Sequence, residues 1–148
     1  MRPIRAMHAL SVILATGLAT SAVAEASPDS GVRSLYAQGT DTVTTYYATW
    51  AAIPGMQLTL PSATPDARFA LVTFNFPAVT TYAAGCDVAV FAGATQYAVL
   101  QTEGTLVTRV PLASGPQMLQ GEWMLVRPGG GGYCQLSTYY SLSAILVK

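Results

Sequence analysis

Apolar and polar residues alternate in short stretches along most of the chain, and these stretches are rich in Val, Thr, Tyr, Phe and Leu. Pro, Gly, Ser and Asp separate them, which is the pattern of β-strands joined by tight turns. No window keeps an apolar period of about 3.6 residues for long enough to predict a helix. The pattern predicts strands at residues 42–50, 56–60, 68–76, 86–91, 97–102, 106–112, 121–127, 133–137 and 139–147.

The faces of two of these stretches indicate how the strands pack. In residues 68–76 one face is fully apolar and the other becomes polar only at Thr73 and Asn75, as expected of a central strand. In residues 139–147 one face is apolar and the other is largely polar, so that one side faces the core. Many short strands of this kind predict an all-β fold: a mostly antiparallel two-sheet sandwich that is jelly-roll-like.

Three segments are expected to lie outside the strands. Residues 25–41 hold Pro, Ser, Asp and Gly with little periodicity, and we expect a flexible lead-in before a β-sandwich domain at 42–148. The sequence Ile-Pro-Gly at 53–55 is predicted to form a turn. Residues 77–85 are predicted to form a loop with Tyr82 at its tip.

The start of the chain has the form of a secretory signal peptide. The basic segment MRPIRAMH precedes the apolar run ALSVILATGLA, and Ala22-Val23-Ala24 supplies the small residues of a cleavage site. We expect residues 1–24 to be removed, with cleavage after Ala24 or after Ala26. The apolar run is too short for a membrane-spanning helix, which needs about 20 residues. The expected location is therefore periplasmic or extracellular.

Removal of the signal peptide leaves 124 residues, a length typical of one domain. This part has five basic and seven acidic residues, a formal charge of −2, and no basic stripe. Nucleic acid is therefore not expected as a partner, and neither is the membrane once the signal peptide has gone.

The two cysteines, Cys86 and Cys134, are predicted to form a disulfide because the compartment is oxidising. The bond closes a loop for which the chain-entropy model gives roughly 4 kcal/mol of stabilisation as an upper figure. Two separate thiols are the alternative interpretation.

The glycines at 129–132 stand directly before Tyr133 and Cys134. A phosphate-binding loop would lead into a helix, whereas this run leads into a predicted strand, so a hairpin connection is the favoured interpretation. The disulfide would bring this loop beside the loop at 77–85. One end of the sandwich then holds the candidate binding residues Tyr82, Asp87, Arg127 and Tyr133.

Tyrosines on loops suit both sugar rings and partner proteins, since each offers a flat apolar face and a hydroxyl. The alternative is that these tyrosines only cover apolar area at the mouth of the core. A second aromatic group, Tyr46, Tyr47 and Trp50, lies in the first predicted strand, and we expect it to serve core or interface packing.

The composition argues against several chemistries. The only histidine, His8, lies in the segment expected to be removed, so the usual base of a catalytic triad is missing. Both cysteines are assigned to the disulfide, and the only lysine is Lys148. We therefore expect no enzyme activity, no cofactor and no metal. Two alternatives stay open: a dispersed calcium site, and a glycosidase pair drawn from Asp66, Asp87, Glu103 and Glu122.

Four short runs carry a resemblance: WAAIPGMQLTL at 50–60, GCD at 85–87, GEW at 121–123 and SLSAIL at 141–146. Together they resemble small secreted bacterial jelly-roll domains. More remotely, the order of strands is similar to the sandwich of the tumour necrosis factor and complement globular-head families. That resemblance implies a homotrimer, and none of it is a catalytic motif.

The function that follows is a secreted, non-enzymatic β-sandwich module that acts by surface recognition or self-assembly, with a protein or glycan partner at the Tyr82 and Tyr133 end. The alternative is a carbohydrate-binding, lectin-like domain at that same end. An outer-membrane β-barrel is a third interpretation, which the seven prolines between residues 54 and 128 and strands shorter than about 9 residues argue against.

Overall fold

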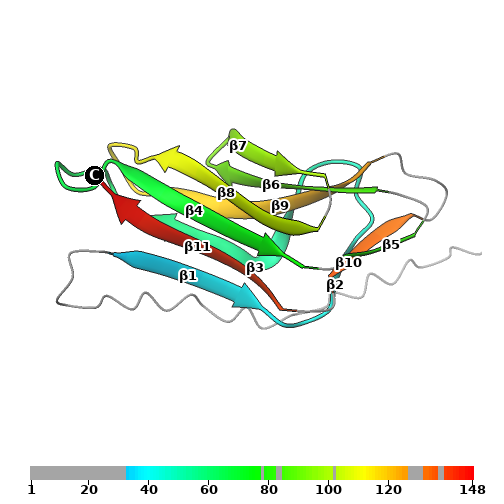
Figure 1. Cartoon of the computed structure of the whole chain (residues 1–148). Coiled ribbons are helices and arrows are strands. Elements are labelled where there is room, and N and C mark those ends of the chain that lie inside the picture. Colours follow the sequence, from blue (N-terminus) through cyan, green and yellow to red (C-terminus); the bar gives the residue numbers. More distant parts are fainter. Residues whose placement is uncertain (1–32, 78, 83–84, 102, 127–131, 137–138) are drawn as a thin grey trace, which may run out of the picture.

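The computed structural model describes residues 33–77, 79–82, 85–101, 103–126, 132–136 and 139–148. Every regular element in these segments is a strand (Figure 1). The strands are β1 (Ser34–Gly39), β2 (Val43–Thr45), β3 (Ala51–Leu60), β4 (Phe69–Phe76), β5 (Val79–Tyr82), β6 (Gly85–Ala92), β7 (Thr95–Leu100), β8 (Gly104–Pro111), β9 (Gln117–Val126), β10 (Tyr133–Leu136) and β11 (Tyr140–Val147).

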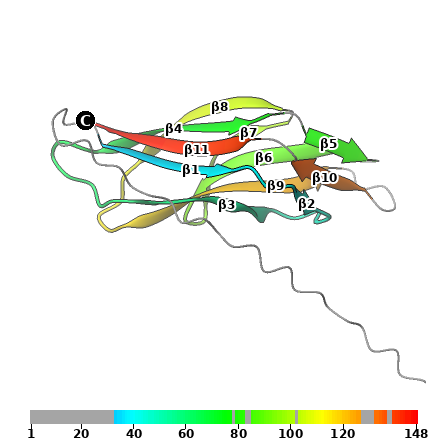
Figure 2. The same ribbon diagram turned by 90° about the horizontal axis from the view of Figure 1, so that it is seen from below.

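Two four-stranded antiparallel sheets form the two layers of the sandwich (Figure 2). The first, called the β1 sheet, has the order β1-β11-β4-β8, and the second, called the β3 sheet, has the order β3-β9-β6-β7. The chain crosses between them after β1, β3, β4, β7, β8 and β9. This is the connectivity of a jelly roll, so the predicted fold class is confirmed.

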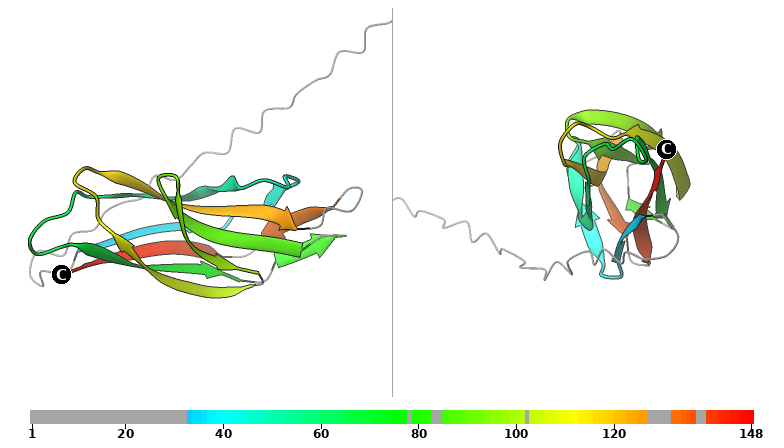
Figure 3. Two further views of the ribbon diagram at one scale, coloured as in Figure 1. Left: turned by 90° about the horizontal axis from the view of Figure 1, so that it is seen from above. Right: turned by 90° about the vertical axis from the view of Figure 1, so that its left-hand side faces the viewer.

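Three of the connections between the sheets pair with one another and form a third, smaller sheet. Its order is β2-β10-β5, and we call it the end sheet. β2 lies between β1 and β3 in the chain, β5 between β4 and β6, and β10 between β9 and β11. The end sheet therefore lies at one end of the long axis, opposite the carboxyl terminus (Figures 1 and 3).

The core lies between the two large sheets and follows from the alternation of side chains along each strand. Alternate residues of β4 and β11 face inward and are fully or almost fully buried. The Phe76 ring meets the Trp123 indole edge-on, with 6.4 Å between centroids. The Phe74 ring fills the space above Gly121, where an added Cβ would lie 3.0 Å from its Cζ. Gly121 thus lets the two sheets approach each other.

Two predictions about the amino-terminal half of the domain are wrong. Of the flexible lead-in expected at residues 25–41, residues 25–32 lie outside the described residues, but Ser34–Gly39 forms β1 and pairs with β11. Only Leu35 and Ala37 of β1 point toward the core, so the strand has too few apolar residues for its pattern to show. β1 is a strand because β11 supplies backbone hydrogen-bond partners, although the sequence of β1 has little strand pattern of its own.

The predicted turn at 53–55 is also wrong, because Ile53, Pro54 and Gly55 lie inside β3. The pairing of β3 with β9 shifts register between Ala52 and Gln57, which is a β-bulge. Gly55 has a positive φ of 77°, the backbone conformation that glycine adopts most readily. The β-bulge therefore accommodates the Pro-Gly sequence, and β3 continues beyond it.

Other boundaries move because of pairing. The predicted strand at 42–50 is short, with only Val43–Thr45 in β2. The loop expected at 77–85 contains β5, which pairs with β10. The predicted strand at 121–127 begins four residues earlier, at Gln117, because β9 pairs along its length with β3 and β6.

Gly121→Ala tests the close approach of the two sheets. The added methyl group would press against the Phe74 ring and against Met56, whose Cβ would lie 3.2 Å away. We expect the free energy of unfolding to fall by about 1–3 kcal/mol, measured by urea denaturation. Gly115→Ala is the matched control, because its Cβ would meet nothing within 4 Å, and a change of less than about 0.5 kcal/mol is expected. Equal losses in both variants would contradict this interpretation.

Candidate functional site

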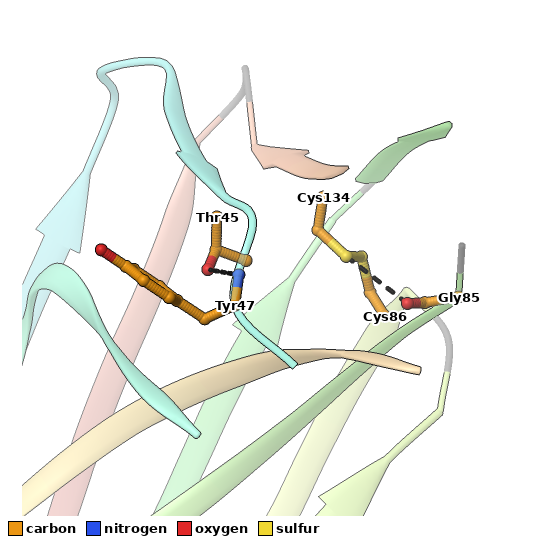
Figure 4. Close-up of a disulfide and its surroundings, with 5 residues drawn as sticks. All are labelled: Thr45, Tyr47, Gly85, Cys86 and Cys134. Atoms are coloured by element: carbon orange, nitrogen blue, oxygen red, sulfur yellow. Dashed lines mark hydrogen bonds between the residues drawn. A yellow bond between two sulfur atoms is a disulfide. The ribbon is translucent and has the colours of Figure 1, made fainter. Parts of the chain in front are cut away.

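The predicted disulfide is present and joins the β3 sheet to the end sheet. Cys86 is the second residue of β6, Cys134 lies in β10, and their Cα atoms are 6.0 Å apart (Figure 4). Both are buried, with 6% and 0% of their surface exposed. The Cys134 Sγ also lies 3.6 Å from the carbonyl oxygen of Gly85, a close contact rather than a hydrogen bond because a disulfide sulfur carries no proton.

The neighbouring strand β2 is fixed beside the disulfide. Thr45 is paired with Cys134 across the end sheet and only 2% of its surface is exposed. Its Oγ1 accepts a hydrogen bond from the backbone N–H of Tyr47 at 3.3 Å (Figure 4). The backbone carbonyl of Tyr47 in turn accepts a hydrogen bond from the N–H of Leu125 in β9, at 2.8 Å. The chain that follows β2 is therefore held at two points.

The side chains of this held segment are strongly exposed. Tyr46 has 67% of its surface accessible and Tyr47 has 65%, more than any other large hydrophobic side chain in the described part of the chain. The Tyr47 side chain extends away from the disulfide (Figure 4). Exposed aromatic rings on a fixed backbone lose little conformational entropy when they bind a partner.

Tyr133 joins this group from β10. Its ring centroid lies 6.1 Å from that of Tyr46, with the planes tilted by 58°. We call Tyr46, Tyr47 and Tyr133 the tyrosine cluster. In the backbone register of the end sheet, Tyr133 is directly opposite Tyr82 of β5. The two tyrosine positions that the sequence indicated are therefore adjacent, although Tyr82 lies in a strand and not at a loop tip.

The other two candidate residues have different outcomes. Asp87 follows Cys86 in β6 and, by alternation, faces the outer side of the β3 sheet, whereas Cys86 faces inward. The structure therefore directs it away from the disulfide. Arg127 and the glycines at 129–131 lie outside the described residues.

Of the expected core or interface packing, the core part is wrong for Tyr46 and Tyr47, whose side chains are exposed, and interface packing stays a prediction. The sequence held a signal against core packing, because two adjacent residues of a strand point to opposite faces and cannot both be in the core. Trp50 is half-buried, and its ring packs on Phe91 with 5.4 Å between centroids. Neither Trp50 nor Phe91 belongs to the core cluster.

Two of the candidate acids, Glu122 and Asp87, lie on neighbouring strands of the β3 sheet. Glu122 is paired with Ala89, and Asp87 with Met124, so the two acids occupy diagonal positions on neighbouring strands. Such positions are about 7–8 Å apart. Partial burial raises the pKa of the Glu122 carboxyl above its usual range.

No protein-family model matches the sequence, and no curated protein is similar to it. Within the described residues, no helix is long and apolar enough to cross a membrane.

Replacement of both cysteines tests the role of the disulfide. We expect Cys86→Ala together with Cys134→Ala to lower the free energy of unfolding by up to about 4 kcal/mol, because the unfolded chain regains the freedom of the closed loop. Denaturation with and without a reductant measures it. The reductant should destabilise the wild type by a similar amount and leave the variant unchanged. Free thiols in the unreduced, denatured wild type would contradict the bond.

Glu122→Gln tests the burial of that carboxyl. Since its pKa is raised by burial, the folded state binds the proton more tightly than the unfolded chain. Its contribution to the free energy of unfolding therefore falls as the pH rises above about 4. We expect Glu122→Gln to be more stable than the wild type at pH 7 and equal to it below about pH 4. The same pH dependence for Asp66→Asn, an exposed carboxyl, would assign the effect to general charge.

Proposed function

We propose that this protein is a secreted, non-enzymatic recognition module that binds a partner through the tyrosine cluster. The observation that carries the proposal is the exposure of Tyr46 and Tyr47 on a backbone that hydrogen bonds hold at Thr45 and Leu125. A group of exposed aromatic side chains that lie side by side is a feature of interaction sites more than of ordinary surface. Aromatic side chains of this kind are the usual anchors of protein interfaces.

The disulfide supports the proposal in two ways. It fixes the end sheet, which carries Tyr133, to the β3 sheet. It also favours an oxidising compartment, in agreement with the signal peptide expected at residues 1–24, which lie outside the described part. We therefore propose a periplasmic or extracellular location.

Self-assembly is the second form of the proposal. The outer face of the β1 sheet exposes Leu71, Val107 and Ile145, by 42%, 59% and 41%. Ile145 is paired directly with Leu71, so part of this apolar area is continuous. A homotrimer would agree with the tumour necrosis factor and complement globular-head families that the sequence remotely resembles.

The double substitution Tyr46→Ala and Tyr47→Ala tests the tyrosine cluster. Since both rings are exposed, we expect the free energy of unfolding to change by less than about 1 kcal/mol. Binding should fall about tenfold or more, as for the loss of an aromatic anchor. Tyr36→Ala is the control, a tyrosine that is 41% exposed on the outer face of the β1 sheet.

Light scattering distinguishes a trimer from a monomer, and a glycan array tests whether the protein binds carbohydrate. A trimer that the double variant dissociates supports self-assembly through the cluster, whereas a trimer that it leaves intact supports self-assembly through the outer face of the β1 sheet. A monomer that binds glycans, with binding lost in the double variant and in Tyr133→Ala, supports the lectin-like alternative. A monomer with an empty array, or turnover of a glycoside or ester that is lost in Glu122→Gln or Asp87→Asn, would contradict the proposal.

A further inference from the structure

The outer face of the β3 sheet carries a cross-strand row that combines amides with an aromatic ring. Its members are consecutive backbone partners on β3, β9, β6 and β7: Gln57, Gln120, Phe91 and Gln96. The row spans three spacings between strands, about 14 Å. In the next row, toward the end sheet, Glu122 is paired with Ala52 and Ala89, and beyond it lies Asp87.

An aromatic pair lies at the centre of this face. The Trp50 and Phe91 rings meet edge to face, with an angle of 66° between their planes, and both are half-buried outside the core cluster. Ala89 is fully buried although it also stands outside that cluster, so side chains on the outer face cover it. The face therefore has an aromatic pair with polar groups beside it, and it also exposes the apolar side chains of Val99 and Met118, by 40% and 52%.

These polar groups have no hydrogen-bond or ion-pair partners among the residues that the structure describes. In the described segments, the side chains of Gln57, Gln96, Gln120, Asp87 and Glu122 make no hydrogen bond or ion pair. Their amides can donate and accept, and their carboxylates accept. The face presents hydrogen-bonding capacity that only solvent or a ligand can use.

The outer face of the β1 sheet is a useful contrast. There the Tyr36 and Tyr139 hydroxyls hydrogen bond to each other, and Tyr139 donates to Gln38 Oε1 at 2.7 Å. Thr105 donates to Asn75 Oδ1 at 3.1 Å. Several polar side chains of that sheet hydrogen bond to one another, whereas those named on the β3 sheet do not.

Charge narrows the choice of ligand. The two rows and Asp87 contain two carboxylates and no cationic side chain. An anionic polymer would be repelled there. A polyhydroxylated neutral chain would not, because its hydroxyls donate to carboxylates and both donate to and accept from amides.

We propose that the outer face of the β3 sheet binds a neutral polysaccharide. The apolar face of a sugar ring packs on Phe91 and Trp50, the hydroxyls bond to Gln57, Gln96 and Gln120, and Glu122 accepts from a ring hydroxyl. No covalent bond is made or broken. The site uses other residues than the tyrosine cluster and does not rest on the function proposed for that cluster.

Affinity electrophoresis of the purified protein in gels that contain soluble starch, mannan, β-glucan or hydroxyethyl cellulose tests the proposal. We expect at least one polymer to retard the wild type. Phe91→Ala should weaken binding about tenfold or more. Gln120→Ala, an outer-face change with little risk to folding, should weaken it roughly three- to tenfold. Gln38→Ala, the same change on the β1 sheet, should leave retardation unchanged.

Three results would overturn the proposal. One is the absence of retardation by every neutral polymer. Another is retardation that persists in Phe91→Ala and Gln120→Ala but is lost in Tyr46→Ala with Tyr47→Ala, which would place the glycan at the tyrosine cluster. The third is retardation by polylysine and by none of the neutral polymers. If Glu122→Gln and Asp87→Asn abolish that retardation, the face binds a cationic peptide. Loss of partner binding at the tyrosine cluster with polysaccharide binding intact contradicts only the other proposal.

Discussion

The burial of alternate residues between two facing sheets determines which side chains this sandwich exposes on its outer faces. Because the side chains of a strand point to opposite faces in turn, the residues that fill the core also determine which of their neighbours face outward. Phe74 and Phe76 meet Trp123 and Gly121 in the centre, and this packing holds the sheets at a fixed separation. A shift of one residue in any pairing would exchange core and surface.

In the end sheet this alternation is short: within its described residues, Cys134 and Leu136 of β10 are fully buried members of the core cluster. The three strands of this sheet are only three or four residues long and come from connections far apart in the sequence. The Cys86–Cys134 bond attaches them to the β3 sheet, and Thr45 is buried against it. Covalent attachment explains how such short strands present exposed tyrosines in a defined arrangement, since strands this short gain little from burial alone.

The two outer faces of the sandwich show that similar composition does not imply similar roles. Both carry amides, hydroxyls and aromatic rings, but the β1 sheet pairs many of its polar groups internally. The β3 sheet leaves three glutamines (Gln57, Gln96 and Gln120) and two carboxylates (Asp87 and Glu122) unpaired in the described segments, and it places the Trp50 and Phe91 rings among them. The apolar residues of the β1 sheet suit a protein contact, whereas the β3 sheet offers hydrogen bonds to a ligand.

Sequence alone determined the all-β class, most of the strands and the disulfide, because alternation and an even number of cysteines are local or compositional signals. It also placed Tyr82 and Tyr133 at the same end. Tertiary pairing decided the rest. β1 and β5 are strands because partners complete their hydrogen bonds, and Pro54 and Gly55 lie in a bulge because β9 pairs on both sides of them. Tyr46 and Tyr47 are exposed, and the glutamines of three strands share one row, only because register between distant segments sets which side chains meet.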